Sequence, residues 1–110
     1  MNAAVYPEAV SEDLKDALAL ADLTASAAGD LDIDNGTLRD ADILVVELGH
    51  GAIRQLREVS RIEETYGIPV VLVAAVEHLA LIDSSDTVAE FVTTPLDPVE
   101  FRIRVRRLVR

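Results

Sequence analysis

The chain has 110 residues, which is the usual size of one domain, and half of them are hydrophobic, so it has enough apolar material for a core. It has no cysteine, which excludes disulfides, thiol catalysis and cysteine-ligated metal sites. Twenty acidic and ten basic residues give a net charge of −10, which opposes nucleic-acid binding by the domain as a whole. We expect a cytoplasmic protein without a membrane segment, because no signal pattern and no long apolar run is present.

The first part of the chain predicts two short strands around a helix. An apolar run over 3–6 is typical of a strand, and the spacing of apolar residues from about 10 to 21 predicts an amphipathic helix. A second strand is weakly indicated over 23–25. The segment 29–42 is the least readable, and Asn35-Gly36 within it argues against a long helix.

The middle of the chain carries the clearest pattern. Residues 43–46 are a continuous β-branched and aliphatic run followed by Glu47, which is typical of a strand buried on both faces. Apolar residues spaced by three and four predict a helix over 52–66, and Gly67 is the residue type expected just past its end. A second buried strand is predicted over 70–74.

The last part predicts a short helix over 76–82, a strand over 88–93 and a final helix from Asp97-Pro98 to Arg110. Strands and helices therefore alternate. We expect a single α/β domain over 1–110, with a five-stranded parallel sheet, helices on both faces and a short or irregular second helix. In such doubly wound, flavodoxin-like sheets ligands bind beyond the carboxyl ends of the strands.

Three stretches together resemble a response-regulator receiver domain of the CheY type over nearly the whole chain. Residues 42–48 resemble the third receiver strand, 68–75 the fourth, and 90–101 the fifth strand with the turn that follows it. The continuation 102–110, which carries five arginines, resembles the last helix of the OmpR/PhoB subfamily. The order and spacing of these stretches indicate the family.

The resemblance implies receiver chemistry, but the residues that carry this chemistry differ. A receiver holds a phosphorylated Asp, a hydroxyl and a Lys where this chain has Glu47, Ala74 and Thr94. After the first strand only Glu8 replaces the usual pair of acids, and Phe91 stands on the fifth strand. We therefore expect a pseudo-receiver with no catalytic residue, metal or cofactor, belonging to an atypical OmpR/PhoB-type transcription regulator that acts without phosphorylation.

Four interpretations stay open for Glu47. Its longer side chain can mimic a phosphoryl charge, or it is merely an acid tolerated at a strand end. It can also be an unconventional phosphoacceptor, or pair with His50 as the acid–base couple of a small α/β enzyme. The spacing of Asp30, Asp32 and Asp34 suggests a calcium loop, but the glycine and glutamate of an EF-hand are missing, so a solvated acidic loop is favoured.

The resemblance also implies a symmetric homodimer through the fourth helix, fifth strand and fifth helix. In the OmpR/PhoB pattern Glu90 pairs with Arg104 of the second subunit. Glu100 matches a further interface acid, but residues 76–86 contain no basic partner for it. DNA would be bound only by a separate C-terminal winged-helix domain, so the chain is either the first part of a longer regulator or a stand-alone module.

Overall fold

Five parallel strands form one sheet in the order β2-β1-β3-β4-β5 in the computed structural model, which describes residues 1–109. The strands are β1 (Asn2–Tyr6), β2 (Thr24–Ala27), β3 (Ile43–Glu47), β4 (Val70–Ala74) and β5 (Glu90–Thr93). The helices are α1 (Glu12–Leu20), α2 (Gly36–Arg39), α3 (Ala52–Tyr66), the short 3-10 turn η1 (Val76–His78), α4 (Leu79–Asp83) and α5 (Pro98–Leu108). This confirms the doubly wound, CheY-like α/β fold.

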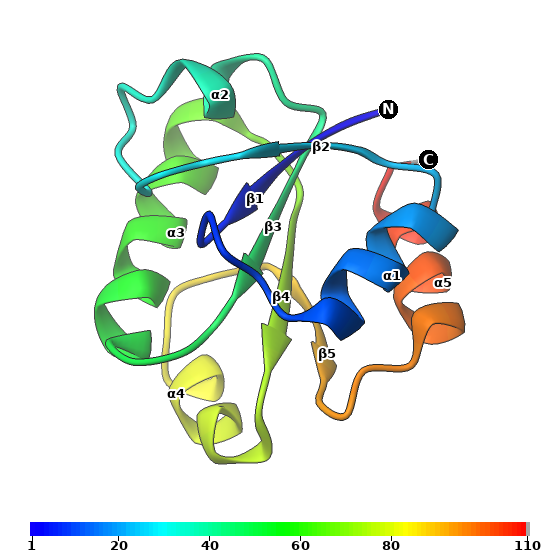
Figure 1. Cartoon of the computed structure of the whole chain (residues 1–110). Helices are drawn as coiled ribbons and strands as arrows, with labels where there is room; N and C mark the ends of the chain where they lie inside the picture. Colours follow the sequence, from blue (N-terminus) through cyan, green and yellow to red (C-terminus); the bar gives the residue numbers. More distant parts are fainter. Residues whose placement is uncertain (110) are drawn as a thin grey trace.

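Helices cover both faces of the sheet, as Figure 1 shows. The helices α1 and α5 lie together on one face, whereas α3 covers the other face with α2 and α4 beside it. Strands β3 and β4 lie in the middle and are buried on both faces, which is why their sequences are continuous apolar runs. Two hydrophobic clusters result, one on each side of the sheet.

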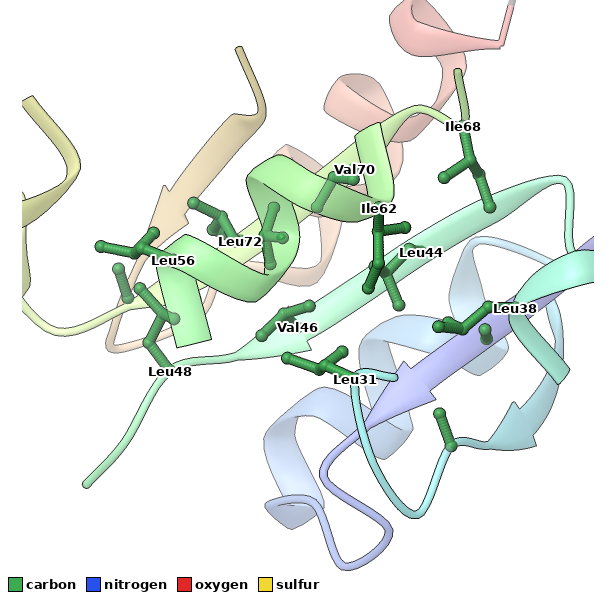
Figure 2. Close-up of a cluster of buried hydrophobic side chains, with 14 residues drawn as sticks. Leu31, Leu38, Leu44, Val46, Leu48, Leu56, Ile62, Ile68, Val70 and Leu72 are labelled. Carbon is green, nitrogen blue, oxygen red and sulfur yellow. The ribbon is translucent and has the colours of Figure 1, made fainter. Parts of the chain in front are cut away.

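The cluster under α3 is drawn in Figure 2. There Leu56 and Ile62 of α3 point toward Leu44 and Val46 of β3 and Leu72 of β4. The predicted spacing of apolar residues by three and four along α3 has a direct physical cause, because these residues form the side of the helix that packs on this core. Its bounds match the prediction, and Gly67 ends it with a left-handed φ of 62°.

The helix ends on the opposite face are set by local capping. Asp97 caps α5 by accepting hydrogen bonds from the backbone N–H of Val99 and of Glu100, as the sequence predicts for Asp-Pro at a helix start. Ser11 caps α1 by accepting from the N–H of Leu14. These caps fix where the two helices start relative to the carboxyl edge of the sheet.

Some elements are shorter than expected. The predicted helix 76–82 is a 3-10 turn followed by a five-residue α4 that buries no residue, and β5 starts at Glu90 instead of 88. The predicted end of the last helix at Arg110 lies outside the described residues. All four residues of β2, at one edge of the sheet, are exposed. No helix within 1–109 combines the length and the apolar character needed to cross a bilayer.

Candidate functional site

An open crevice of about 370 Å³ lies at the carboxyl edge of the sheet. Strands β3, β4 and β5 are hydrogen-bonded neighbours, so their carboxyl ends meet here, as the sequence predicts for a parallel sheet. The crevice also reaches the start of α1 and the loop that leads into α5. Its lining consists of Pro7, Ser11, Asp13, Glu47, Leu48, Gly49, Val73, Ala75, Thr94 and Leu96.

Glu47 is the last residue of β3, and both of its carboxylate oxygens are hydrogen-bonded to Ser11. The backbone N–H of Ser11 donates to Oε1 at 3.0 Å, and the Ser11 hydroxyl donates to Oε2 at 2.6 Å. Because Ser11 is the N-cap of α1, the carboxylate lies at the N-terminal end of that helix, where the helix dipole stabilises negative charge. Glu47 therefore joins β3 to α1.

The other two positions of the receiver pattern, Ala74 at the end of β4 and Thr94 just after β5, offer no cation. Ala74, the last residue of β4, is fully buried and has only a methyl group. Its carbonyl accepts a hydrogen bond from the N–H of Thr94 at 2.9 Å, which fixes the chain after β5. The Thr94-Pro95 peptide is cis. The residues that line the crevice include two carboxylates, those of Glu47 and Asp13, and no Lys, Arg or His.

The structure revises which acids belong to the site. Glu8 lies on an exposed bend and does not line the crevice, whereas Asp13 in the first turn of α1 does. Within residues 1–109 no group of three acidic or His side chains is placed to hold a metal ion. Ser11 and Asp13 were missed from the sequence. A polar residue such as Ser11 just before a helical apolar pattern signals a helix cap, but it does not signal that this residue contacts Glu47.

His50 and Glu47 line different hollows. His50 lines a larger hollow of about 530 Å³ between α3 and the loop after β2, together with Tyr6 and Arg54, and Glu47 is not among the lining residues. General acid–base catalysis needs both groups within hydrogen-bond reach of one substrate. The linings of these two hollows do not bring Glu47 and His50 together, and their pairing as a catalytic couple stays a prediction.

The acidic loop after β2 is held by its own side chains. Asp30 accepts hydrogen bonds from the N–H of Asp32 and from the side-chain amide of Asn35, and Asp32 accepts from the N–H of Asp34. Such contacts are typical of turns in which an aspartate carboxylate accepts a hydrogen bond from the backbone N–H two residues further on. These aspartates shape the loop, and Asn35 then caps α2.

On the face formed by α4, β5 and α5, Glu90 and Arg104 bind each other within one chain. Arg104 Nη1 lies 2.8 Å from Glu90 Oε1, and both side chains are partly exposed. Phe91 is 38% exposed on the edge strand, and Glu100 is exposed on α5. If Glu90 paired with Arg104 of a second subunit, that contact would replace the internal one. The pairing between subunits stays a prediction.

Comparison with known proteins supports the fold. No family model matches the chain, and no curated protein matches it in sequence. Among solved structures, NtrX from Brucella abortus, a response regulator solved in complex with ATP, is similar with a TM-score of 0.69 and 14% sequence identity. The similarity covers 98% of this chain and 26% of that chain, so the chain spans about a quarter of the length of NtrX.

Proposed function

We propose that this chain is a receiver-like signalling domain that acts without phosphorylation of the residue that ends β3. The observation that carries the proposal is the contact of Glu47 with Ser11. The position where a receiver has its phosphorylated Asp here holds a carboxylate that is already bound by two donors at the start of α1. Its negative charge is part of the fold instead of being added by a kinase.

The neighbouring positions support the same conclusion. Phosphoryl transfer depends on positioning and on stabilising the charge of the transferred group, usually with a metal ion and a cation. Here Ala74 supplies a methyl group, Thr94 has no charge, and the crevice carries the carboxylate of Asp13 beside that of Glu47. Two carboxylates without a lining cation would repel an incoming phosphoryl donor. The domain therefore signals by protein contact and does not catalyse a reaction.

We further propose that the domain forms a homodimer of the OmpR/PhoB type. It would be part of an atypical regulator in which a separate domain binds DNA. The partly exposed Phe91, Glu90 and Arg104 of β5 and α5 favour this face. The similarity to about a quarter of NtrX favours a role as one part of a longer protein. The acidic charge of the chain agrees with the absence of direct DNA binding.

The first part of the proposal is tested by incubating the domain with Mg²⁺ and acetyl phosphate and measuring its intact mass. We expect no added phosphoryl group, whereas an ordinary receiver treated in parallel gains one. The Glu47→Gln variant is the matched control, because any adduct on the β3 carboxylate must disappear in it. A stable phosphoryl adduct that Glu47→Gln removes would overturn the proposal and favour phosphorylation at an unconventional acceptor.

A further inference from the structure

The hollow that His50 lines has a volume of about 530 Å³ and lies between α3 and the loop that joins β2 to α2. Figure 1 shows this loop beside α3, away from α5. The volume is in the range of sites that bind small molecules, about 300–1,000 Å³. The hollow shares no lining residue with the crevice at Glu47, so what it binds does not depend on the function proposed above.

The wall formed by this loop carries two carboxylates, those of Asp30 and Asp32. Oδ1 of Asp30 accepts hydrogen bonds from the N–H of Asp32 and from the side-chain amide of Asn35, and Oδ1 of Asp32 accepts one from the N–H of Asp34. Within residues 1–109, Oδ2 of each aspartate has no hydrogen bond and no ion pair. One oxygen of each carboxylate therefore shapes the loop, and the other remains available to a ligand.

The loop is also anchored to the rest of the fold on both sides of Asp32. Leu31 is buried, and Figure 2 draws it with the cluster under α3. The carbonyl of Ile33 accepts a hydrogen bond from the hydroxyl of Tyr66 at the end of α3. Because this wall is already held in place, a ligand that binds to it loses little free energy in ordering the loop.

The opposite wall is one side of α3 and carries Arg54, Glu58 and Arg61, which lie three and four residues apart. Arg54 Nε lies 3.1 Å from Glu58 Oε1, so these two charges compensate each other. Arg61 is exposed, and it forms no ion pair in the part of the chain that the structure describes. This wall therefore presents one uncompensated positive charge.

The charges of the two walls do not meet, since no ion pair joins the loop to α3 across the hollow within residues 1–109. The negative charges of Asp30 and Asp32 lie on one side, and the positive charge of Arg61 lies on the other. Charge complementarity favours a ligand with two cationic groups and one anionic group. The buried Leu31 and the half-buried Tyr6 also line the hollow and offer an apolar contact to an aliphatic chain.

We propose that this hollow binds a free basic amino acid such as L-lysine. The carboxylate of the amino acid binds to Arg61, because a guanidinium group matches a carboxylate in geometry and charge. Its two ammonium groups bind to Asp30 and Asp32, and its methylene groups pack against Leu31 and Tyr6. Since the charged side chains of both walls are exposed, each contact contributes little and the affinity is weak.

Titration of the natural chain with four compounds tests the proposal through the amide chemical shifts of residues 30–33 and 50–61. L-Lysine carries all three charged groups, whereas cadaverine lacks the carboxylate and L-norleucine lacks the side-chain ammonium. We expect L-lysine to bind about tenfold more tightly than either of them. Nα-acetyl-L-lysine N-methylamide mimics a lysine within a protein chain, and it should also bind more weakly, because it keeps only the side-chain ammonium.

Two variants then test the two walls separately. Arg61→Gln should weaken the binding of L-lysine about tenfold but not that of cadaverine, which has no carboxylate for Arg61 to bind. Asp32→Asn keeps an oxygen that accepts the N–H of Asp34 but loses the charge, so it should weaken both compounds. Arg57→Gln and Asp34→Asn are the matched controls, since they remove the same charges from residues that do not line the hollow, and they should leave both affinities unchanged.

The proposal is overturned if L-lysine causes no saturable shifts in these residues, or if cadaverine or L-norleucine binds as tightly as L-lysine. Equal weakening of L-lysine and cadaverine by Arg61→Gln also overturns it. So does a control variant that weakens L-lysine as much as Arg61→Gln or Asp32→Asn. If the acetylated lysine amide binds as tightly as L-lysine, the occupant is a lysine side chain of a partner protein and the free amino acid is the wrong ligand.

Discussion

The contact of Ser11 with Glu47 predicts a measurable loss of stability when the serine hydroxyl is removed. In Ser11→Ala, α1 loses its side-chain cap to Leu14, which costs about 1 kcal/mol. The 2.6 Å hydrogen bond from the hydroxyl to Glu47 is charge-assisted, but Ser11 is exposed, so its loss adds only about 1 kcal/mol. The sum of about 2 kcal/mol lowers the melting temperature of a domain of this size by about 8 °C.

Urea unfolding of four proteins tests this reasoning: the natural chain, Ser11→Ala, Glu47→Gln and the variant with both changes. Glu47→Gln should cost about 1 kcal/mol, since the amide oxygen still accepts the Ser11 N–H but carries no full charge. The two costs should not add, and a coupling energy of about 1 kcal/mol is expected for residues in direct contact. Glu64→Gln, on the exposed side of α3, controls for the loss of one negative charge. Two results would refute the claim that Ser11 holds the Glu47 carboxylate at the start of α1. One is that the costs of Ser11→Ala and Glu47→Gln add without a coupling energy, and the other is that Glu47→Gln is as stable as the Glu64→Gln control.

Three further predictions follow from other contacts. Burial raises the pKa of Glu63, although its hydrogen bond from Thr87 opposes this, so the folded chain holds that proton more tightly than the unfolded chain. The free energy of unfolding should therefore fall as pH rises from the ordinary glutamate pKa through the raised one, and Glu63→Gln should be more stable at neutral pH and lack this fall. Gly67→Ala should destabilise the domain by about 1 kcal/mol, because Gly67 ends α3 with a left-handed φ. Sedimentation should show that Arg104→Glu weakens the dimer through α4, β5 and α5, and that adding Glu90→Arg restores it.

Each of these results has a control and an outcome that contradicts it. Equal pH profiles of the natural chain and Glu63→Gln would mean that this carboxyl is not responsible for the fall in stability. Gly29→Ala should be nearly neutral, since Gly29 has no left-handed φ and no atom near its missing side chain, so equal costs at Gly29 and Gly67 would contradict the capping argument. If the double charge swap associates no better than Arg104→Glu alone, Glu90 and Arg104 pair only within one chain.

The elements that the sequence predicts well are those whose ends depend on neighbouring residues. Asp97 binds amides two and three residues further on, and Gly67 ends its own helix, so both signals are local. The strands 43–47 and 70–74 are also readable, because burial on both faces requires a continuous apolar run. The weaker signals were α4, which buries no residue, and β2, which is exposed and made of small residues.

The candidate site was predictable by position but not by contact. The carboxyl ends of parallel strands meet at one edge, so Glu47, Ala74 and Thr94 could be placed there from the order of the strands. The bond from Ser11 to Glu47 joins residues 36 apart, and no sequence pattern encodes the direction of a side chain across that separation. The same applies to Glu90 and Arg104, for which family position indicated a partner in another chain while the fold also brings them together in one.

The exposed strand β2 has a consequence for how the chain avoids aggregation. It pairs with β1 on one side only, so its other side presents backbone N–H and C=O groups on which a further strand could add. Thr24, Ala25, Ser26 and Ala27 carry no charge, and none of them is the lysine or proline that often protects such an edge. Asp22 and Asp30 lie on either side of the strand, within a chain of net charge −10. Repulsion between chains therefore protects this edge, and this protection weakens where acid neutralises the carboxylates or salt screens them.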